Sequence, residues 1–319
     1  MLDSQYAQTQ SLAAEETIAR ATPKTKRTRD TSAHSGLIED ILAHIALIVI
    51  AATVLFPVVW IVSMSLDGRN ISRPTSLAII PPNPSLDAYR RVLTEPQANN
   101  VMFSTMLKNS LLLSIGVSLV VVVFAVTAAY AFARFHFPGR KWGLFLFIAV
   151  LMLPSVATLA PLFVLLSQIK IPGSTESVRS TLFGVGIAYT SGALPFAIWN
   201  LRGYIDTLPK ELEESALVDG ATRLQTFRII VLPVVRGGLF ATAVFTFVFA
   251  WNDFIFALVL TRNAATTFPV QVTHYFGGQS NFWAKIAAMS TLGTVPIFIA
   301  VAMLQKFLVR GVSMGAVKG

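Results

Sequence analysis

The residue types that could do chemistry in this chain are concentrated in one polar stretch, residues 211–228, between long apolar runs. The stretch holds the carboxylates of Glu211, Glu213, Glu214 and Asp219 and the guanidiniums of Arg223 and Arg228. Such a cluster beside an apolar helical face can dock in a groove of another protein. The other interpretation is an ordinary helix in a loop.

The same stretch carries the signals of two short helices. Pro209 predicts a helix start, because its ring presets a helical φ and its missing donor is not needed in the first turn. Gly220 predicts a stop, and Thr222 and Gln225 have the spacing of a capping box that starts a second helix. Pro233 then ends or kinks that helix. We therefore expect helix, glycine turn, helix.

Motifs for catalysis are missing from the sequence. The dipeptide Gly-Lys does not occur, so there is no phosphate-binding loop, and neither a His-Glu-x-x-His nor a Gly-x-Ser-x-Gly pattern is present. There are no cysteines, and the 4 histidines stand far apart in the sequence. We expect no catalytic residue, no metal site and no cofactor held by this chain.

Composition identifies a membrane protein. Hydrophobic residues make up 54% of the 319 residues and charged residues 13%, which is too apolar for a soluble chain of this length. The formal charge of +9 does not indicate nucleic-acid binding, because Lys and Arg lie between apolar runs and not on one basic face.

A helix needs ~20 apolar residues to cross the hydrocarbon layer, and six stretches qualify. They are residues 41–66, 110–133, 142–169, 181–201, 237–261 and 286–305. Prolines inside several of them predict kinks. The predicted fold is an all-α polytopic membrane protein with six transmembrane helices and a cytoplasmic helix-turn-helix loop.

Charge distribution predicts the orientation. Most of the 25 Lys and Arg residues fall on the side that holds both termini and the loop of residues 203–236, which places these in the cytoplasm. We divide the chain into a disordered cytoplasmic tail (1–40), a first transmembrane helix with an external loop and short helix (41–104), and a core (105–319). The core has five transmembrane helices, the loop 203–236 and a short cytoplasmic C-terminal tail.

One acidic residue, Asp253, lies inside a predicted span, next to Asn252. A carboxylate at membrane depth is costly unless it faces water or a polar partner. Asp253 therefore either pairs or packs between helices, or lines a passage. One isolated acid cannot form a relay of proton carriers, and no internal repeat is visible, which argues against an ion-coupled secondary transporter.

The loop resembles the signature of the inner-membrane subunits of bacterial ATP-binding-cassette importers. The matching pattern is Glu214-x-Ala216, three residues, Gly220, nine residues, and Ile230-x-Leu232-Pro233. Ser215 departs from the family, which usually has Ala there. Residues 129–139, 195–204 and 251–258 are also similar to the maltose-type inner subunit of sugar importers.

This resemblance implies a permease subunit that pairs with a homologous second permease subunit, two ATPase subunits and an external solute-binding protein. ATP and Mg would be bound by the ATPase subunits, and the residue matching Glu214 would meet the ATPase while the turn at Gly220 fits its cleft. We call residues 203–236 the coupling loop. Its implied site residues are Glu213, Glu214, Ala216, Asp219, Gly220, Ala221, Ile230, Leu232 and Pro233, and the candidate pathway residues are Asn252 and Asp253.

The implied substrate is a sugar of the disaccharide or oligosaccharide type, such as maltose or trehalose. A polyol or glycerol phosphate is the alternative within the family. Outside it, the alternatives are an ion-coupled carrier and a membrane enzyme or assembly scaffold. The expected location is the cytoplasmic membrane of a bacterium or archaeon.

Overall fold

The computed structural model describes residues 33–69, 79–81, 83–97, 100–261, 265–273 and 283–315. The regular structure of these residues is helical apart from two isolated β-bridges, between Asp67 and Pro84 and between Lys170 and Ser177. The predicted all-α class is confirmed.

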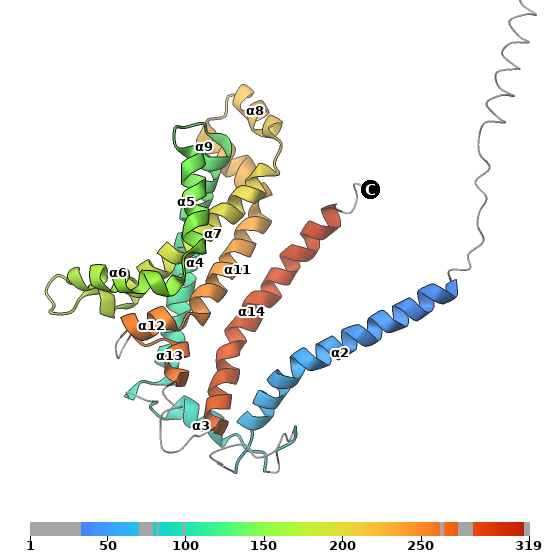
Figure 1. Ribbon diagram of the computed structural model, residues 1–319, viewed down its shortest axis with the longest axis vertical. Coiled ribbons are helices and arrows are strands. Elements are labelled where there is room, and N and C mark those ends of the chain that lie inside the picture. Colours follow the sequence, from blue (N-terminus) through green and yellow to red (C-terminus); the bar gives the residue numbers. More distant parts are fainter. Residues whose placement is uncertain are drawn as a thin grey trace, which may run out of the picture. The chain divides into compact units, whose positions relative to one another are not determined.

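Five long helices carry most of the apolar sequence. They are α2 (Ala33–Ser65), α4 (Phe103–Arg134), α7 (Leu182–Asp206), α11 (Arg236–Asn252) and α14 (Trp283–Gly315) (Figure 1). The shorter helices are α3 (Asp87–Thr94), α5 (Arg140–Met152), α6 (Ser155–Gln168), α8 (Lys210–Val218), α9 (Arg223–Thr226), α10 (Leu232–Val234), α12 (Ile255–Leu260) and α13 (Phe268–Thr273). A 3-10 turn, η2, covers Val178–Ser180, and a π-helical segment, η3, covers Phe227–Val231.

Four helices of the described chain are long and apolar enough to cross a membrane, and up to six spans result if each of two bent pairs counts as one. The predicted third span is the bent pair α5 and α6, which meet at 101°. Pro154 is the N-cap of α6, because proline has no backbone donor and restricts the residue before it.

The predicted fifth span ends earlier than expected. The sequence predicts one span over residues 237–261, but α11 ends at Asn252 and α12 begins at Ile255. The Asp253 carboxylate accepts a hydrogen bond from the Phe256 backbone N–H at 3.1 Å. The first turn of a helix leaves backbone N–H groups without a partner, and this bond satisfies one of them at the start of α12. One helix can therefore end and another begin here.

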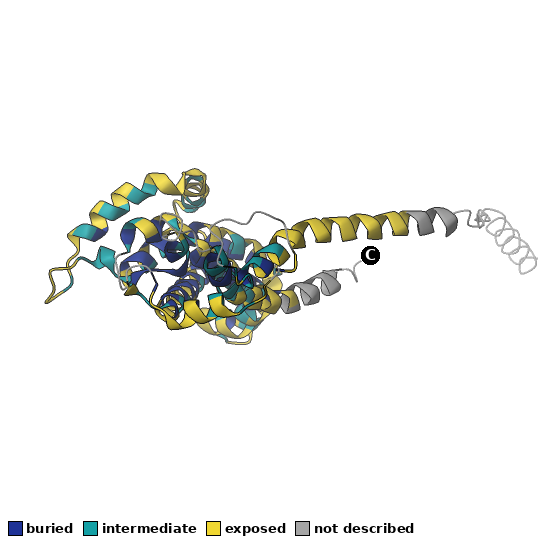
Figure 2. Ribbon diagram, turned by 90° about the horizontal axis from the view of Figure 1, so that it is seen from below, coloured by how far each residue is buried: buried dark blue, intermediate teal, exposed yellow. Residues whose placement is uncertain are grey.

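Contacts divide the chain at Pro57 into two units. The described part of the first unit is the beginning of α2, which starts at Ala33, so residues 33–40 are helical and not part of the predicted tail. Extending an existing helix is far easier than nucleating one, which accounts for this earlier start. Residues 1–32 of the predicted tail, and residues 316–319 at the other end, lie outside the described residues. The apolar side chains of α2 between Ile41 and Val59 are exposed (Figure 2).

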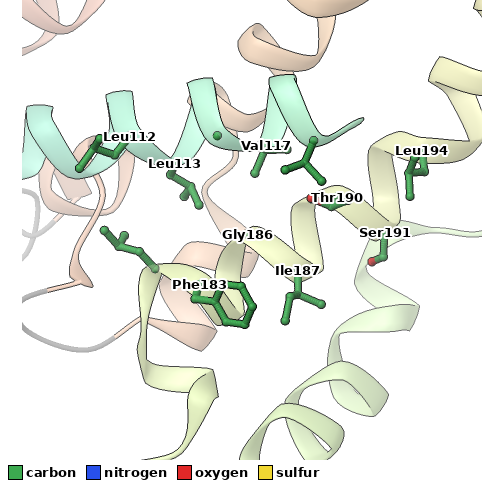
Figure 3. A pocket seen from close by; sticks show the side chains of 12 residues that line it. Leu112, Leu113, Val117, Phe183, Gly186, Ile187, Thr190, Ser191 and Leu194 are labelled. Atoms are coloured by element: carbon green, nitrogen blue, oxygen red, sulfur yellow. The ribbon is translucent and has the colours of Figure 1, made fainter. Parts of the chain in front are cut away.

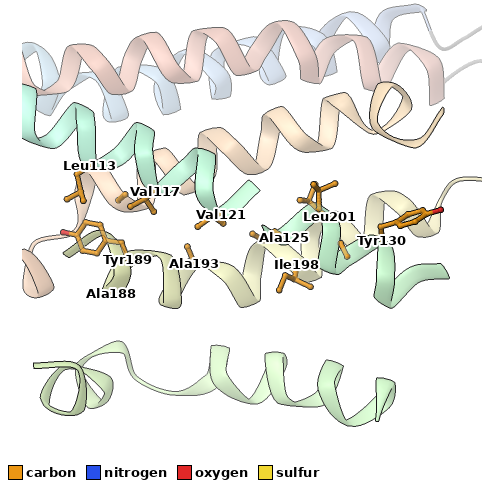
Figure 4. Packing of buried hydrophobic residues seen from close by; sticks show 14 of the residues in the cluster. Leu113, Val117, Val121, Ala125, Tyr130, Ala188, Tyr189, Ala193, Ile198 and Leu201 are labelled. Atoms are coloured by element: carbon orange, nitrogen blue, oxygen red, sulfur yellow. The ribbon is translucent and has the colours of Figure 1, made fainter. Parts of the chain in front are cut away.

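The core of the second unit forms where two rows of buried side chains meet. In each row, successive residues are four positions apart. On α4 the buried ridge is Val117, Val121, Ala125, Ala129 and Ala133, and on α7 it is Val185, Tyr189, Ala193, Ala197, Leu201 and Ile205. Residues four apart share one helical face, and several of these residues are small. The two helices can therefore approach closely along their length (Figure 4).

Polar side chains join α11 to this pair. The Ser118 hydroxyl of α4 donates to the Ala243 carbonyl at 2.7 Å, and the Asn200 amide of α7 donates to the Thr242 hydroxyl at 2.9 Å. Each such bond between membrane helices contributes about 0.6 kcal/mol. Helices α4, α7 and α11 thus form one body whose ends hold the coupling loop.

The predicted short helix of the first external loop is present as α3. Val92 on α3 is fully buried and packs in a cluster with Phe103 and Met106 of α4. The Tyr89 hydroxyl lies 2.6 Å from the Ser65 hydroxyl. This end of the core is therefore closed by side-chain packing and not by loop backbone alone.

Candidate functional site: the coupling loop

The turn after α8 is a Schellman motif centred on glycine. Gly220 has φ of +87°, a conformation that costs a residue with a Cβ about 1–2 kcal/mol. Its N–H donates to the Leu217 carbonyl at 3.2 Å, and the Ala221 N–H donates to the Ala216 carbonyl at 3.0 Å. Both bonds satisfy carbonyls that the end of α8 leaves free. The predicted glycine stop is confirmed in its geometry.

The second helix begins as predicted and then departs from an α-helix. Thr222 and Gln225 form a capping box, with bonds of 2.7 and 3.3 Å. Phe227–Val231 is π-helical, and the segment that ends at Val234 meets α11 at a bend of 73°. Pro233 explains this winding, because its ring would clash with the carbonyl of Ile229 in a regular α-helix. The expected kink is present.

The two adjacent glutamates of α8 have opposite environments. Glu214 is exposed, whereas Glu213 is 7% exposed. One oxygen of Glu213 accepts from Arg134 Nε at 2.6 Å, and the other accepts from the Tyr130 hydroxyl at 3.0 Å. The pair is enclosed, since the side chains of Arg134 and Glu213 are 7% and 10% exposed. Glu213 is therefore engaged inside the chain, and Glu214 is presented outward.

Arg134 also binds the end of α7. Its Nη2 donates to the carbonyls of Ile205 and Leu208, both at 3.0 Å. A cation is favourable at the C-terminal end of a helix, and a carboxylate is favourable in the first turns of one, where Glu213 lies on α8. We call Tyr130, Arg134 and Glu213 the internal strut, because they tie the end of α4 to α7 and α8.

The signature residues of the loop separate by burial. Glu214, Asp219, Gly220 and Pro233 are exposed, whereas Ala216, Ala221, Ile230 and Leu232 are half-buried. Beside the exposed group, Val218 is 87% exposed and Leu224 is 65% exposed. The loop thus presents the carboxylates of Glu214 and Asp219 next to an uncovered apolar surface, on a base that packs against the core.

The candidate pathway residues lie at the opposite end of α11 from the coupling loop. Asn252 is exposed, and its amide donates to the Val248 carbonyl at 2.9 Å. Asp253 is half-buried and caps α12, while the Tyr189 hydroxyl donates to the Asp253 backbone carbonyl at 3.4 Å. The 17 residues of α11 span about 25 Å, so the two sets of site residues are not brought together.

A groove of about 530 Å³ runs between α4 and α7 (Figure 3). Its walls are aliphatic and aromatic side chains such as Leu112, Val120 and Phe183, and its hydroxyls come from Thr190 and Ser191. The Ser191 hydroxyl already donates to the Ala188 carbonyl at 2.8 Å. A polyhydroxylated solute needs many more hydrogen-bonding groups than this lining offers.

The chain matches a family of known proteins. Residues 121–314 match the family of binding-protein-dependent transport system inner membrane components. This chain belongs to that family. As a member of this family, the chain takes part in transport and not in catalysis. It is a multi-pass inner membrane protein. Within the described residues, no group of three or more His, Cys, Asp or Glu side chains could hold a metal ion.

Two relatives of this permease family illustrate the extent of the match. The trehalose/maltose transport system permease protein MalG of Thermococcus litoralis is 32% identical, over 89% of this chain and 98% of its own length. The trehalose transport system permease protein SugB of Mycobacterium tuberculosis is 35% identical, over 83% and 93%.

A third relative and one solved structure extend the comparison. The diacetylchitobiose uptake system permease protein DasC of Streptomyces coelicolor is 33% identical, over 86% of this chain and 96% of its own length. The crystal structure of a bacterial ABC transporter that imports the polysaccharide alginate matches with a TM-score of 0.68 at 22% identity. It covers 85% of this chain and 97% of that one. The fold of this permease is therefore shared with a solved transporter.

Sequence reasoning missed the internal strut of this permease. From the sequence, Tyr130 and Arg134 belong only to the segment 129–139 that resembles the family, with no role predicted for either. The available signal was their spacing of four residues on one helical face at the end of an apolar run, where an arginine needs a partner.

Proposed function

We propose that this chain is one of the two permease subunits of an ATP-driven sugar importer, and that it couples to an ATPase subunit through α8 and the turn at Gly220. One observation carries the coupling role. Glu214 is exposed on α8, and the adjacent Glu213 forms a buried ion pair of 2.6 Å with Arg134 of α4. A docking surface that transmits force must be both accessible and rigidly held, and this helix combines the two properties.

The strut explains how motion at α8 would reach the membrane helices. Arg134 joins α8 to the ends of both α4 and α7. Removing one partner of a buried ion pair costs about 3–5 kcal/mol, so α8 follows α4 and α7 as a unit and does not slide over them. Closure of the ATPases would thus rock these helices, which alternates access to the passage.

The proposed assembly contains a homologous second permease subunit, two ATPase subunits and an external solute-binding protein. ATP and Mg would be bound by the ATPase subunits. The coupling loop and both termini then lie in the cytoplasm. Asn252 and Asp253 are proposed to line the passage, since Asn252 is exposed and Asp253 only half-buried at the break between α11 and α12.

The names of the relatives support a disaccharide or oligosaccharide as substrate. Those relatives transport trehalose and maltose, trehalose, and diacetylchitobiose. All these solutes are built from linked sugar rings. We propose a solute of this class for the present chain.

The test is to isolate the tagged chain gently from its native membrane, identify the proteins that accompany it, and measure sugar-stimulated ATP hydrolysis. Glu214→Ala should insert normally and retain the ATPase subunits about 100-fold less well, because a cation of the ATPase is left without its partner. Glu211→Ala is the matched control, since Glu211 is an exposed glutamate of the same helix.

The possible results separate two claims. Isolation of the chain without any ATPase subunit would refute the importer assignment itself. Normal ATPase retention and normal import by Glu214→Ala would refute the coupling role of α8 and leave the importer assignment standing.

A further inference from the structure

A cationic pocket lies at the end of the core that carries α8, beside the link between α4 and α5. It has a volume of about 580 Å³. Its side chains include His136, Arg140, Lys141, Trp142, Leu144 and Arg202. Neither the coupling loop nor the candidate pathway uses these residues. The volume falls within the range of small-molecule sites.

Local structure holds one cation of this pocket, Arg140, in place. The link from α4 ends at Gly139, whose φ of +86° turns the chain so that α5 begins at Arg140. The Arg140 Nε donates to the Phe132 carbonyl of α4 at 2.7 Å. That bond fixes the guanidinium and leaves its two Nη groups to donate to a ligand.

The charges of Arg140 and Lys141 in this pocket are not balanced by a carboxylate of the described chain. No carboxylate lines the pocket. Among the described residues, Arg140 and Lys141 form no ion pair, and Arg202 shares its charge with Asp206 at 3.2 Å, where both side chains are partly exposed. The neighbouring pocket next to α8 differs in its charge, because the carboxylates of Glu213 and Glu214 line it together with its cations. The cationic pocket therefore favours an anion.

The pocket stands at the boundary between polar and apolar surface. Trp142 is 76% exposed and packs edge-on against Phe145, which is 62% exposed. Exposed tryptophan at the end of an apolar helix is typical of the membrane interface. Beyond it, α5 buries none of its residues within the described chain, so an uncovered apolar face leads away from the cations.

We propose that the cationic pocket binds the phosphodiester headgroup of an anionic phospholipid from the leaflet at the α8 end, with its acyl chains along the exposed face of α5. Free phosphate would satisfy the cations but not the apolar face, whereas one lipid satisfies both. Basic pockets between membrane helices bind anionic headgroups by the same chemistry. This inference does not depend on the sugar or on the coupling role of α8.

The full chain in lipid nanodiscs tests the proposal. The discs contain phosphatidylcholine with a minor fraction of photoactivatable phosphatidylglycerol, and cross-linked peptides are mapped by mass spectrometry. We expect adducts within residues 136–146, displaced by unlabelled phosphatidylglycerol and much less by phosphatidylcholine. Equal displacement by both lipids would overturn the proposal.

Variants test the cations directly. Each Lys or Arg near an anionic headgroup contributes about fivefold in affinity, so Arg140→Gln with Lys141→Gln should weaken phosphatidylglycerol binding about 30-fold. Lys141→Gln alone, at an exposed position, should weaken phosphatidylglycerol binding about fivefold. This single variant keeps the test valid if the double variant does not fold. The control, Arg228→Gln with Arg236→Gln, removes two exposed cations outside the pocket and should leave binding unchanged. Equal losses in the pocket and control variants would contradict a specific site.

Two additions distinguish other ligands. An excess of inorganic phosphate should leave the lipid adducts intact, and complete displacement by phosphate would mean that the pocket prefers a soluble anion, which would overturn the lipid assignment. Adding the ATPase subunits should also leave the adducts intact. Their loss would mean that the pocket is part of a protein interface, which would refute the lipid site.

Discussion

The internal strut makes a prediction that compares two adjacent residues of identical type. Glu213→Gln keeps the size and the hydrogen-bonding oxygen of the side chain but removes its charge, which leaves Arg134 charged at 7% side-chain exposure. An uncompensated buried charge costs about 3–5 kcal/mol. We take the lower end, about 3 kcal/mol, because Arg134 keeps its bonds to the carbonyls of Ile205 and Leu208.

The assay is amide hydrogen exchange of the purified full chain, followed peptide by peptide. At 1.4 kcal/mol for each factor of ten, protection of the α8 amides should fall about 150-fold in Glu213→Gln. Glu214→Gln is the control, since this exposed residue forms no ion pair within the described residues, and its α8 protection should stay within about twofold. Protection of α4 near its middle should not change in either variant.

A third variant tests whether the loss comes from the unpaired charge. The double variant Glu213→Gln with Arg134→Gln should lose less protection than the two single variants combined, because it leaves no charge buried without a partner. Equal α8 protection in Glu213→Gln and Glu214→Gln would refute the argument that the strut holds α8. Additive losses in the double variant would refute the ion pair as its cause.

Three further predictions follow from local geometry. Gly220→Ala should destabilise the end of α8 by about 1–2 kcal/mol, because a Cβ there has open space but opposes the left-handed turn. Gly220→Asn should destabilise it less, because asparagine tolerates that turn, and equal amide exchange of α8 in the two variants would contradict this. Asp253→Ala should remove the cap on the Phe256 N–H and destabilise α12 by about 1 kcal/mol, measured by exchange of α12, whereas Asp253→Asn should preserve it. The Arg69 guanidinium, hydrogen-bonded to Asp67 at 2.7 Å, holds the pKa of that carboxyl below its ordinary value of 3.8. The pair therefore stabilises the turn after α2 above pH 3.8, and this contribution is lost as the pH falls through the lowered pKa. Exchange of the Gly68 amide should accelerate at low pH relative to an unstructured peptide, and Asp67→Asn should abolish that excess.

The sequence by itself determined the features that depend on neighbours along the chain. The Schellman turn at Gly220 and the capping box of Thr222 and Gln225 close through bonds between residues three to five apart, so residue type and spacing were sufficient. Membrane class also follows from the length of the apolar runs. The kink at Pro233 was expected for the same local reason, although its π-helical form was not.

Only the tertiary structure decided which polar groups meet. Glu213 and Glu214 are identical in type and adjacent, and their different environments arise because Arg134 and Tyr130, 79 and 83 residues away, reach one of them. The break after Asn252 also involves a distant residue, because the Tyr189 hydroxyl, 64 residues away, donates to the Asp253 backbone carbonyl. Helical period tells which residues share a face but not which distant helix covers that face. The partner of a buried charge is therefore set by the packing of α4, α7 and α8, because only that packing removes the charge from water.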